Sequence, residues 1–354
     1  MNDNVIKIDY PKNTQPSRQQ DNAVSKQSPQ SPLQQILKLV EDDLVCVNHM
    51  IIDKMHSSVS MIPELAGYLV ASGGKRIRPL LTLAGANLCG YVGTRHINLA
   101  TCVEFIHTAT LLHDDVVDES VLRRGQKSAS TIWGNQASVL VGDFLFSRAF
   151  QLMVSDGSLR VLKILSDASA KIAEGEVLQL QIIRKLDSSE AQYMEMIIAK
   201  TATLFEAAAR VPAIISESSE QFEQALGEYG TNLGIAFQLS DDVLDYQTSS
   251  QKLGKEVGDD FREGKLTLPV LLAWRRCTQK QQSFWNRTIC DGNLHDGDLD
   301  QAIEMMQHYD VFEDCLSRAR HFATVADDAL QVFPHTPMRK ALSQLAYYCV
   351  DRYY

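Results

Sequence analysis

The chain has 354 residues, of which 45% are hydrophobic, and it carries a formal net charge of −10. A chain of this length and composition can bury a large core, either as one large domain or as two. The negative charge and the lack of a dense lysine and arginine run in the sequence exclude nucleic-acid binding as the main activity. Any phosphate chemistry must therefore depend on a local cluster of basic residues.

The first segment, residues 1–31, is rich in Gln, Ser, Asn and Pro and poor in large apolar side chains. Such a composition cannot offset the entropy of ordering, so we predict a disordered polar tail. No signal peptide is expected, and no charge-free run of roughly 18 apolar residues predicts a transmembrane segment. The seven cysteines form no CxxC pair and predict reduced core thiols, which favours a cytoplasmic location.

From Pro32 onward, apolar residues recur every three or four positions, as in LQQILKLVEDDLVCVNHMIIDKM, and strict alternation is scarce. Short breaks rich in Gly, Ser and Asp separate the helical segments, among them ASGGKRIRP, RRGQKS, VSDGS and CDGNLHDGD. None of them has the character of a domain linker. We therefore predict that residues 32–354 form one all-α domain, a single large helical bundle with a central active-site cavity.

The segment GGKRIRPLL places Lys75, Arg76 and Arg78 after two glycines and before Pro79, a residue suited to the first turn of a helix. A glycine-containing loop that carries cations into a helix N-terminus can bind a phosphate group. The alternative interpretation is an ordinary charged loop.

The segment LLHDDVVDES gathers Asp114, Asp115 and Asp118 within an apolar stretch. Like charges are costly to bury together unless cations neutralise them, so these carboxylates face either water or a metal. On a helix, Asp114 and Asp118 share a face about one turn apart and can present their oxygens together. A solvated helix face is the alternative, and the apolar flanks oppose it.

The same DDxxD spacing recurs in QLSDDVLDY, as Asp241, Asp242 and Asp245, so Asp241 and Asp245 are likewise expected to share a face and present their oxygens together. If the two helices face each other across the bundle, their carboxylates converge. An all-oxygen set of this kind suits Mg²⁺, which keeps several waters and gains its other ligands from substrate phosphates. The pair of motifs therefore predicts a diphosphate ligand held through magnesium.

Basic and polar side chains around these motifs extend the candidate site. His107 lies two helical turns before Asp114 on about the same face, and Arg123 and Arg124 follow the first aspartate helix. The segments AKTATLF and GKEVGDDFREGKLTLP come later and resemble further phosphate ligands and a lid. Spacing alone does not establish these roles.

Taken in order, GGKRIRP, LLHDDVVDES with RRG, KTATLF, QLSDDVLDY and GKEVGDDFREGKLTLP closely resemble the motifs of the trans-isoprenyl diphosphate synthases. The chain is most similar to their long-chain members, the octaprenyl to decaprenyl diphosphate synthases of quinone biosynthesis. The resemblance extends from about residue 32 to the end of the chain. It implies Mg²⁺-dependent, head-to-tail condensation of isopentenyl diphosphate onto an allylic diphosphate such as farnesyl diphosphate, by a homodimeric prenyltransferase.

The resemblance also assigns roles to individual residues. Asp114, Asp118 and Asp241 would bind Mg²⁺, about three ions once a diphosphate is present, with help from Asp115, Asp242 and Asp245. Isopentenyl diphosphate would be held by Lys75, Arg78, His107 and Arg124. The allylic diphosphate would be held by Arg123, Lys200, Thr201, Gln238, Lys255 and Lys265, and Lys200 would count among the catalytic residues.

Product length is expected to depend on Ala109 and Thr110, the residues five and four positions before the first aspartate. In this family these positions line the tunnel for the growing chain, and short-chain members typically carry a bulky aromatic residue nearby. Two small side chains leave room for a long product, so the resemblance implies an all-trans chain of C40 to C50. A weak association with a membrane surface is compatible with so hydrophobic a product.

Several other functions are compatible with parts of the pattern. A short-chain synthase making C15 to C20 products and a non-catalytic subunit of a hetero-oligomeric synthase would both share the motifs. A class I terpene cyclase is disfavoured because its second metal motif normally differs from DDxxD. A di-iron bundle would use a Glu-x-x-His element such as Glu104 to His107, but it needs a second one, which the sequence lacks.

Overall fold

The computed structural model describes residues 31–71, 76–123, 125–247 and 257–351. The part from Pro32 onward forms one compact unit. Nearly all of the predicted tail lies outside the described residues, so its disorder stays a prediction.

The elements of the first half of the chain are α1 (Pro32–Leu39), α2 (Glu41–Lys54), α3 (Met61–Ala71), α4 (Ile77–Leu88), α5 (Arg95–Val117), β1 (Leu122–Arg123), β2 (Gln126–Lys127), α6 (Ala129–Trp133), α7 (Asn135–Asp156) and α8 (Leu159–Ile182). Those of the second half are α9 (Glu190–Ile197), η1 (Ile198–Ala202), α10 (Thr203–Ile215), α11 (Glu220–Gln247), α13 (Asp259–Glu263), α14 (Leu268–Arg276), α15 (Gln279–Trp285), η2 (Asn286–Cys290), α16 (Asp298–His308), α17 (Val311–Ala329), η3 (Leu330–Val332) and α18 (Pro337–Val350).

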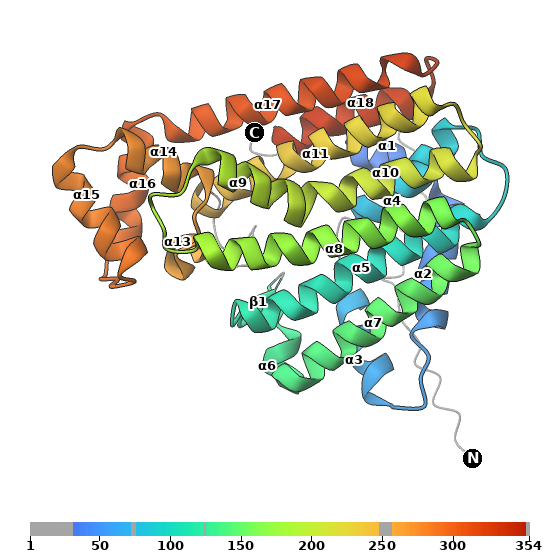
Figure 1. The fold of residues 1–354 in the computed structure, drawn as a ribbon, viewed down its shortest axis with the longest axis horizontal. Coiled ribbons are helices and arrows are strands. Elements are labelled where there is room, and N and C mark those ends of the chain that lie inside the picture. The colour runs from blue at the N-terminus through green and yellow to red at the C-terminus, as the bar shows by residue number, and fades with distance from the viewer. Residues whose placement is uncertain (1–30, 72–75, 124, 248–256, 352–354) are drawn as a thin grey trace, which may run out of the picture. The chain divides into compact units, whose positions relative to one another are not determined.

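The long helices lie side by side and enclose two central helices, α5 and α11 (Figure 1). Helix α5 packs against α2, α4, α7 and α10, and α11 packs against α10, α17 and α18. Both central helices bury residues on most sides, as expected for helices inside a bundle rather than on its surface. The prediction of an all-α bundle is confirmed, and each DDxxD motif lies on one of the two central helices.

The sequence breaks act as helix ends for local reasons. Gly157 adopts a left-handed conformation, with φ of 79°, and ends α7. The next residue, Ser158, caps α8 by accepting a hydrogen bond at its Oγ from the backbone N–H of Val161. Ser189 and Gln192 form a capping box that begins α9.

One break differs from the all-helical expectation. At the RRGQKS break, β1 and β2 form a small antiparallel hairpin in which Leu122 pairs with Lys127 and Arg123 pairs with Gln126. Gly125, with φ of 75°, supplies the turn. Strands of two residues are too short for an alternating pattern, so the sequence could not reveal them.

One helix in the described part of the chain, α7, has the length and apolar composition of a membrane-crossing helix, although the sequence predicted no such segment. It packs along α5, and 39% of its most apolar window is buried. Because the core helix of a soluble protein can have the same length and composition, this is weak evidence for a span. The outer face of α7 does expose apolar side chains, including Leu140 at 66% and Val154 at 66%.

All seven cysteines are free thiols in the structure. The prediction that they belong to the core holds for Cys102, Cys315 and Cys349, which are buried. It is wrong for Cys46, which is exposed on α2. An amphipathic helix alone does not show which side of a small apolar residue is covered by its neighbours.

Candidate active site

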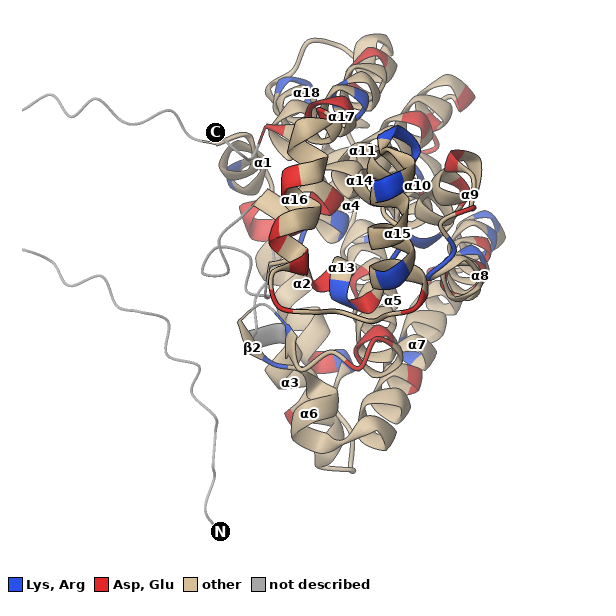
Figure 2. Ribbon diagram, turned by 90° about the vertical axis from the view of Figure 1, so that its left-hand side faces the viewer, with Lys and Arg blue, Asp and Glu red and all other residues tan. Residues whose placement is uncertain are grey.

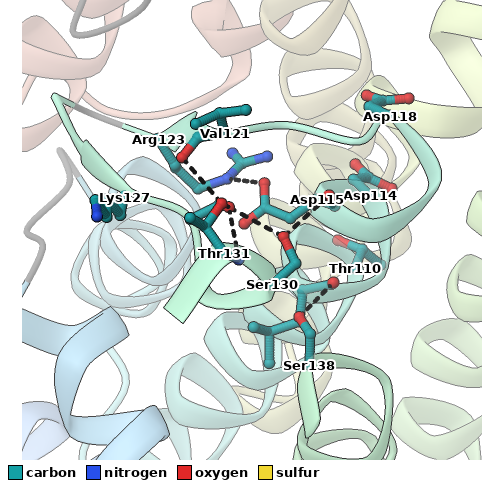
Figure 3. A network of polar contacts seen from close by, with 12 residues as sticks. Thr110, Asp114, Asp115, Asp118, Val121, Arg123, Lys127, Ser130, Thr131 and Ser138 are labelled. Atoms are coloured by element: carbon teal, nitrogen blue, oxygen red, sulfur yellow. Dashed lines mark hydrogen bonds and ion pairs between the residues drawn. The ribbon is translucent and has the colours of Figure 1, made fainter. Parts of the chain in front are cut away.

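The three aspartates of the first motif lie at the C-terminal end of α5 and point in two directions. Asp114 and Asp118 keep 15% and 17% of their side chains exposed, whereas the side chain of Asp115 is fully buried. Figure 3 shows Asp115 turned toward Arg123 while Asp114 and Asp118 lie to the other side. This is the arrangement expected for positions i, i+1 and i+4 of a helix.

The buried Asp115 anchors the hairpin that follows α5. Its Oδ1 accepts a hydrogen bond of 2.6 Å from Arg123 Nε, and its backbone carbonyl accepts one of 3.3 Å from Ser130 Oγ (Figure 3). Thr131 Oγ1 donates to the carbonyl of Val121, 3.3 Å away, and closes the loop. Asp115 therefore fixes the position of Arg123 and faces away from the predicted metal ligands.

Lys200 lies among carboxylates from two other helices. Its Nζ is 2.6 Å from Glu176 Oε2 on α8 and 3.7 Å from Asp114 Oδ2 on α5. Burial alone would lower the pKa of Lys200, but Asp114 and Glu176 raise it, so the lysine stays charged. Burial and the charge of Asp114 raise the pKa of Glu176 to about 7, although Lys200 opposes them.

Glu176 is a functional candidate that sequence reasoning missed. It lies in EGEVLQL, a helical segment without a recognisable motif, and its partners are distant in sequence. The only available signal was a glutamate beside a glycine on a long amphipathic helix, which is too common to be specific.

Lys200 and Thr201 enter the site from a π-helix, η1. Wider turns of this kind are rare and often occur at functional sites. Glycines on two neighbouring helices make room for it. A Cβ atom on Gly175 of α8 would lie 2.7 Å from the backbone N of Lys200, and one on Gly234 of α11 would lie 2.6 Å from Ala202 Cα. Close backbone contact from both sides thus fixes the position of Lys200 and Thr201.

The second motif also divides into exposed and buried carboxylates. Asp241 is exposed on α11, whereas Asp242 and Asp245 are only 3% and 5% exposed. The expectation that Asp241 and Asp245 present their oxygens together is therefore wrong, because Asp245 is buried. Asp242 Oδ1 accepts a hydrogen bond of 2.7 Å from Gln238 Nε2, and Gln238 Oε1 in turn accepts one of 2.9 Å from Thr201 Oγ1. Burial, with the charge of nearby Asp260, raises the pKa of Asp242 to about 7.

Asp245 and Lys265 connect the second motif to the first. Asp245 Oδ2 accepts a hydrogen bond of 3.1 Å from the backbone N–H of Asp260 on α13. Just after α13, Lys265 Nζ lies 2.9 Å from Asp118 Oδ2 and 2.5 Å from Glu263 Oε2. Burial alone would lower the pKa of Lys265, but Asp260, Asp118 and Glu263 raise it. Lys265 thus lies among carboxylates as a charged side chain, as Lys200 does.

Arg78 and His107 form a separate pair on the neighbouring side of α5. Arg78 Nη1 lies 3.1 Å from His107 Nε2, and its guanidinium stacks 4.6 Å above the centre of the Phe205 ring. A pocket adjoins this pair, with His107, Arg76 and Arg123 among its polar lining residues and Leu111 and Phe105 among its apolar ones. Asp115 of the first motif also lines this pocket, whereas Asp114 and Asp118 do not.

Three predicted phosphate ligands, Lys75, Arg124 and Lys255, lie outside the described residues. Of the two predicted chain-length residues, Ala109 is fully buried in α5. Thr110 is partly buried, and its Oγ1 donates to the carbonyl of His107 at 2.8 Å. Both side chains therefore occupy little space beside the aspartates.

The expected convergence of carboxylates into a ready metal cluster is not observed. Among the described residues, no three carboxylate, histidine or cysteine side chains are close enough together to hold a metal ion. The positively charged Lys200 and Lys265 lie beside the acids of the first motif instead. Acidic and basic segments accordingly occur together around α13 and the end of α5 (Figure 2).

The donor set nevertheless fits Mg²⁺ bound together with a diphosphate. Asp114 and Asp118 are partly exposed oxygen donors on one helical face, and Asp241 is an exposed oxygen donor on the other central helix. Mg²⁺ is usually held by one or two carboxylates, several waters and substrate phosphates rather than by a complete protein cage. The lysines would then pair with phosphate oxygens instead of carboxylates.

Comparisons with known proteins show the family to which the chain belongs. The model of a family described as polyprenyl synthetase matches residues 59–306. The octaprenyl diphosphate synthase of Escherichia coli strain K12 is 47% identical over 320 residues, which are 90% of this chain and 99% of that protein.

Solved structures of similar proteins share the fold. A polyprenyl synthase from Caulobacter crescentus, crystallised with calcium and isoprenyl diphosphate, superposes with a TM-score of 0.89 and 48% identity over 92% of this chain and 99% of that one. A decaprenyl diphosphate synthase from Rhodobacter capsulatus gives a TM-score of 0.87 and 48% identity over 91% of this chain and 99% of that one. The helical bundle is therefore of the isoprenoid synthase type.

Proposed function

The chain belongs to the polyprenyl synthetase family, and from this premise we propose that it is a long-chain trans-polyprenyl diphosphate synthase. It adds isopentenyl diphosphate repeatedly to an allylic diphosphate such as farnesyl diphosphate and makes an all-trans chain of C40 to C50 for quinone side chains. The observation that carries this proposal is the pair of DDxxD motifs on α5 and α11, with Lys200 and Lys265 beside the acids.

Binding of the allylic diphosphate depends on both the negatively charged aspartates and the positively charged lysines of this site. Asp114, Asp118 and Asp241 would hold Mg²⁺, which would supply positive charge to the leaving diphosphate when bound. Lys200 and Lys265 exchange their carboxylate partners for phosphate oxygens and add fixed positive charge where negative charge develops.

The reaction breaks the allylic C–O bond and leaves positive charge on carbon. The double bond of isopentenyl diphosphate attacks that carbon, and a proton is then lost to the departing diphosphate. Arg78 and His107 orient the diphosphate of this second substrate. Water must be kept from the allylic cation during this step, because it would convert the cation to an alcohol.

Two observations support the assignment of a long product: the products of similar synthases, and the small side chains beside the first aspartate motif. Relatives similar to this chain over nearly its whole length make octaprenyl and decaprenyl diphosphates. Ala109 and Thr110 present small side chains next to the aspartates, which supports a tunnel that stays open past α5.

We also propose a homodimer that works in the cytoplasm. The apolar side chains on the outer faces of α7 and α8, including Leu140 at 66% exposure and Val177 at 56%, favour a protein partner covering these faces. A second copy of the chain is the simplest such partner. A single elution position at monomer mass would contradict the dimer.

The first experiment incubates the purified protein with Mg²⁺, farnesyl diphosphate and labelled isopentenyl diphosphate, and sizes the dephosphorylated products by chromatography. We expect a metal-dependent ladder ending at C40 to C50. Asp114→Ala should lower the rate by roughly 100-fold or more. The matched control is Asp167→Ala, which removes an aspartate that is 60% exposed on α8 and pairs only with Lys163 among the contacts observed.

The outcomes separate the alternatives. Products that stop at C15 or C20 would keep the chemistry but contradict the long-chain assignment. No product from the pure protein, with activity restored by a second polypeptide, would indicate a subunit of a hetero-oligomeric synthase. Equal decreases in the rate of product formation in the Asp114 and Asp167 variants would contradict the metal-binding role of Asp114.

A further inference from the structure

Tyr193 makes a buried hydrogen bond to the second aspartate motif from a different helix. It lies on α9, is fully buried, and donates from its hydroxyl to Asp242 Oδ2 at 2.6 Å. The two residues are 49 positions apart in the sequence. No motif of the sequence includes Tyr193.

The bond from Tyr193 completes the set of donors around Asp242. One carboxylate oxygen accepts from Tyr193, and the other accepts from Gln238 Nε2 at 2.7 Å. With both oxygens engaged and only 3% of the residue exposed, Asp242 is held in one orientation. Its position differs from that of Asp241, the adjacent residue, which is exposed.

The orientation of Asp242 also determines that of Gln238. The amide nitrogen of Gln238 must face the carboxylate, so its oxygen faces Thr201 and accepts the 2.9 Å hydrogen bond from Thr201 Oγ1. A continuous chain of hydrogen bonds thus runs from Tyr193 through Asp242 and Gln238 to Thr201. Both ends of this chain lie on one continuous stretch of helix, since α9 is followed directly by η1.

We propose that Tyr193 is a positioning residue for the diphosphate and Mg²⁺ site: it locks Asp242 as an anchor between α9 and α11, and this anchor sets the position of Asp241, Gln238 and Thr201. The inference rests on the proposed function, in which Asp241 holds Mg²⁺, and on the roles that the resemblance gives to Gln238 and Thr201 in holding the allylic diphosphate. Asp242 itself acts as a support within the protein rather than as a metal ligand.

The test compares Tyr193→Phe with a matched control, Tyr229→Phe. Tyr229 is 1% exposed on α11, and its hydroxyl donates to the backbone carbonyl of Leu342 at 2.8 Å. Each substitution removes one hydroxyl and one buried hydrogen bond, so both should lower the urea midpoint. Binding of inorganic diphosphate in the presence of Mg²⁺ is measured by calorimetry, which does not depend on product formation.

We expect Tyr193→Phe to raise the Kd for magnesium diphosphate by about tenfold and Tyr229→Phe to change it by less than about twofold. In steady-state assays, Tyr193→Phe should also raise the Mg²⁺ concentration needed for half-maximal rate, with the KM for isopentenyl diphosphate unchanged. Equal Kd values for wild type and Tyr193→Phe would overturn the proposal, as would equal increases in both tyrosine variants.

A double-mutant cycle with Asp242→Asn tests whether the two residues act together. If Tyr193 acts through Asp242, the double variant should bind magnesium diphosphate no more weakly than the weaker single variant. Independent, multiplicative losses would contradict the inference. If the wild-type protein binds magnesium diphosphate but forms no prenyl product, the proposed function is rejected. The role of Tyr193 is then still tested by the Kd values for magnesium diphosphate. If the wild type did not bind magnesium diphosphate, both would fail.

Discussion

Replacing Gly234 by alanine should separate α11 from η1, two helices that carry residues of the candidate site. An alanine Cβ at this position would lie 2.6 Å from Ala202 Cα and 3.1 Å from Ala202 Cβ. Carbon atoms prefer separations of about 3.5 to 4.0 Å, so α11 and η1 would have to move apart by about 1 Å. The atoms in the way belong to backbone and a short side chain, which cannot rotate aside.

The magnitude follows from comparison with a second glycine on the same helix. A Cβ on Gly227 would meet Arg210 Cδ at 3.6 Å, Glu206 Cγ at 3.8 Å and Glu206 Oε1 at 4.0 Å, all ordinary contact distances. Gly227→Ala should therefore stabilise the protein by about 1 kcal/mol through helix propensity. Gly234→Ala gains the same propensity term but adds overpacking of about 1 to 3 kcal/mol, so the difference between the two variants isolates the clash.

Urea unfolding of both variants measures that difference, and a prenyl transfer assay measures its effect on the site. Because Ala202 follows Lys200 and Thr201 directly, a displacement of about 1 Å should lower kcat/KM by roughly 100-fold in Gly234→Ala. Gly227→Ala should retain wild-type activity. If the two variants were equally stable and equally active, the close approach of α11 to η1 would not be what positions Lys200.

Three further predictions concern other parts of the chain. The hydrogen bonds from Arg287 hold the pKa of the Asp298 carboxyl below its usual range. The Arg287–Asp298 pair therefore stabilises the fold fully above a pH of about 3.9, the pKa of an unfolded aspartate. This stabilisation is lost as the pH falls through the lowered pKa of the folded state. The urea midpoint of Arg287→Met should thus fall below that of wild type near neutral pH and converge with it in acid; a constant gap down to pH 3 would be inconsistent with this linkage. Thr110→Phe should shorten the products toward C15 to C20 at little cost in stability, because this position is only partly buried; an unchanged product length by chromatography would remove Thr110 from the tunnel. Lys265→Met should raise the KM for the allylic diphosphate by about tenfold and leave that for isopentenyl diphosphate unchanged, since Lys265 lies beside Asp118; a rise in both KM values would point to a general loss of structure.

The candidate site shows which features could be predicted. The repeated DDxxD spacing, its apolar flanks and the basic segments could be read directly, and helical geometry alone places Asp114 and Asp118 on one face with Asp115 turned away. The helical period also predicted the all-α bundle, because a bundle core requires apolar residues at that period along every helix. These features depend only on residues that are close together in the chain.

The contacts that each side chain makes, in contrast, could be identified only from the tertiary structure. The sequence did not reveal that Glu176 contacts Lys200, that Tyr193 contacts Asp242, or that Arg123 engages Asp115. It also suggested carboxylates gathered around metal, whereas Lys200 and Lys265 lie beside the first motif.

The physical reason is that some features depend on residues close together in the sequence and others on residues far apart in it. Local spacing fixes the direction in which a side chain leaves its helix, because backbone geometry repeats every few residues. What the side chain meets depends on how helices from distant parts of the chain pack, and that packing is determined by the whole core together. The sequence by itself therefore determined the helices, the aspartate motifs and the family resemblance. Only the tertiary structure decided which acids remain exposed as candidate metal ligands and which are buried as anchors.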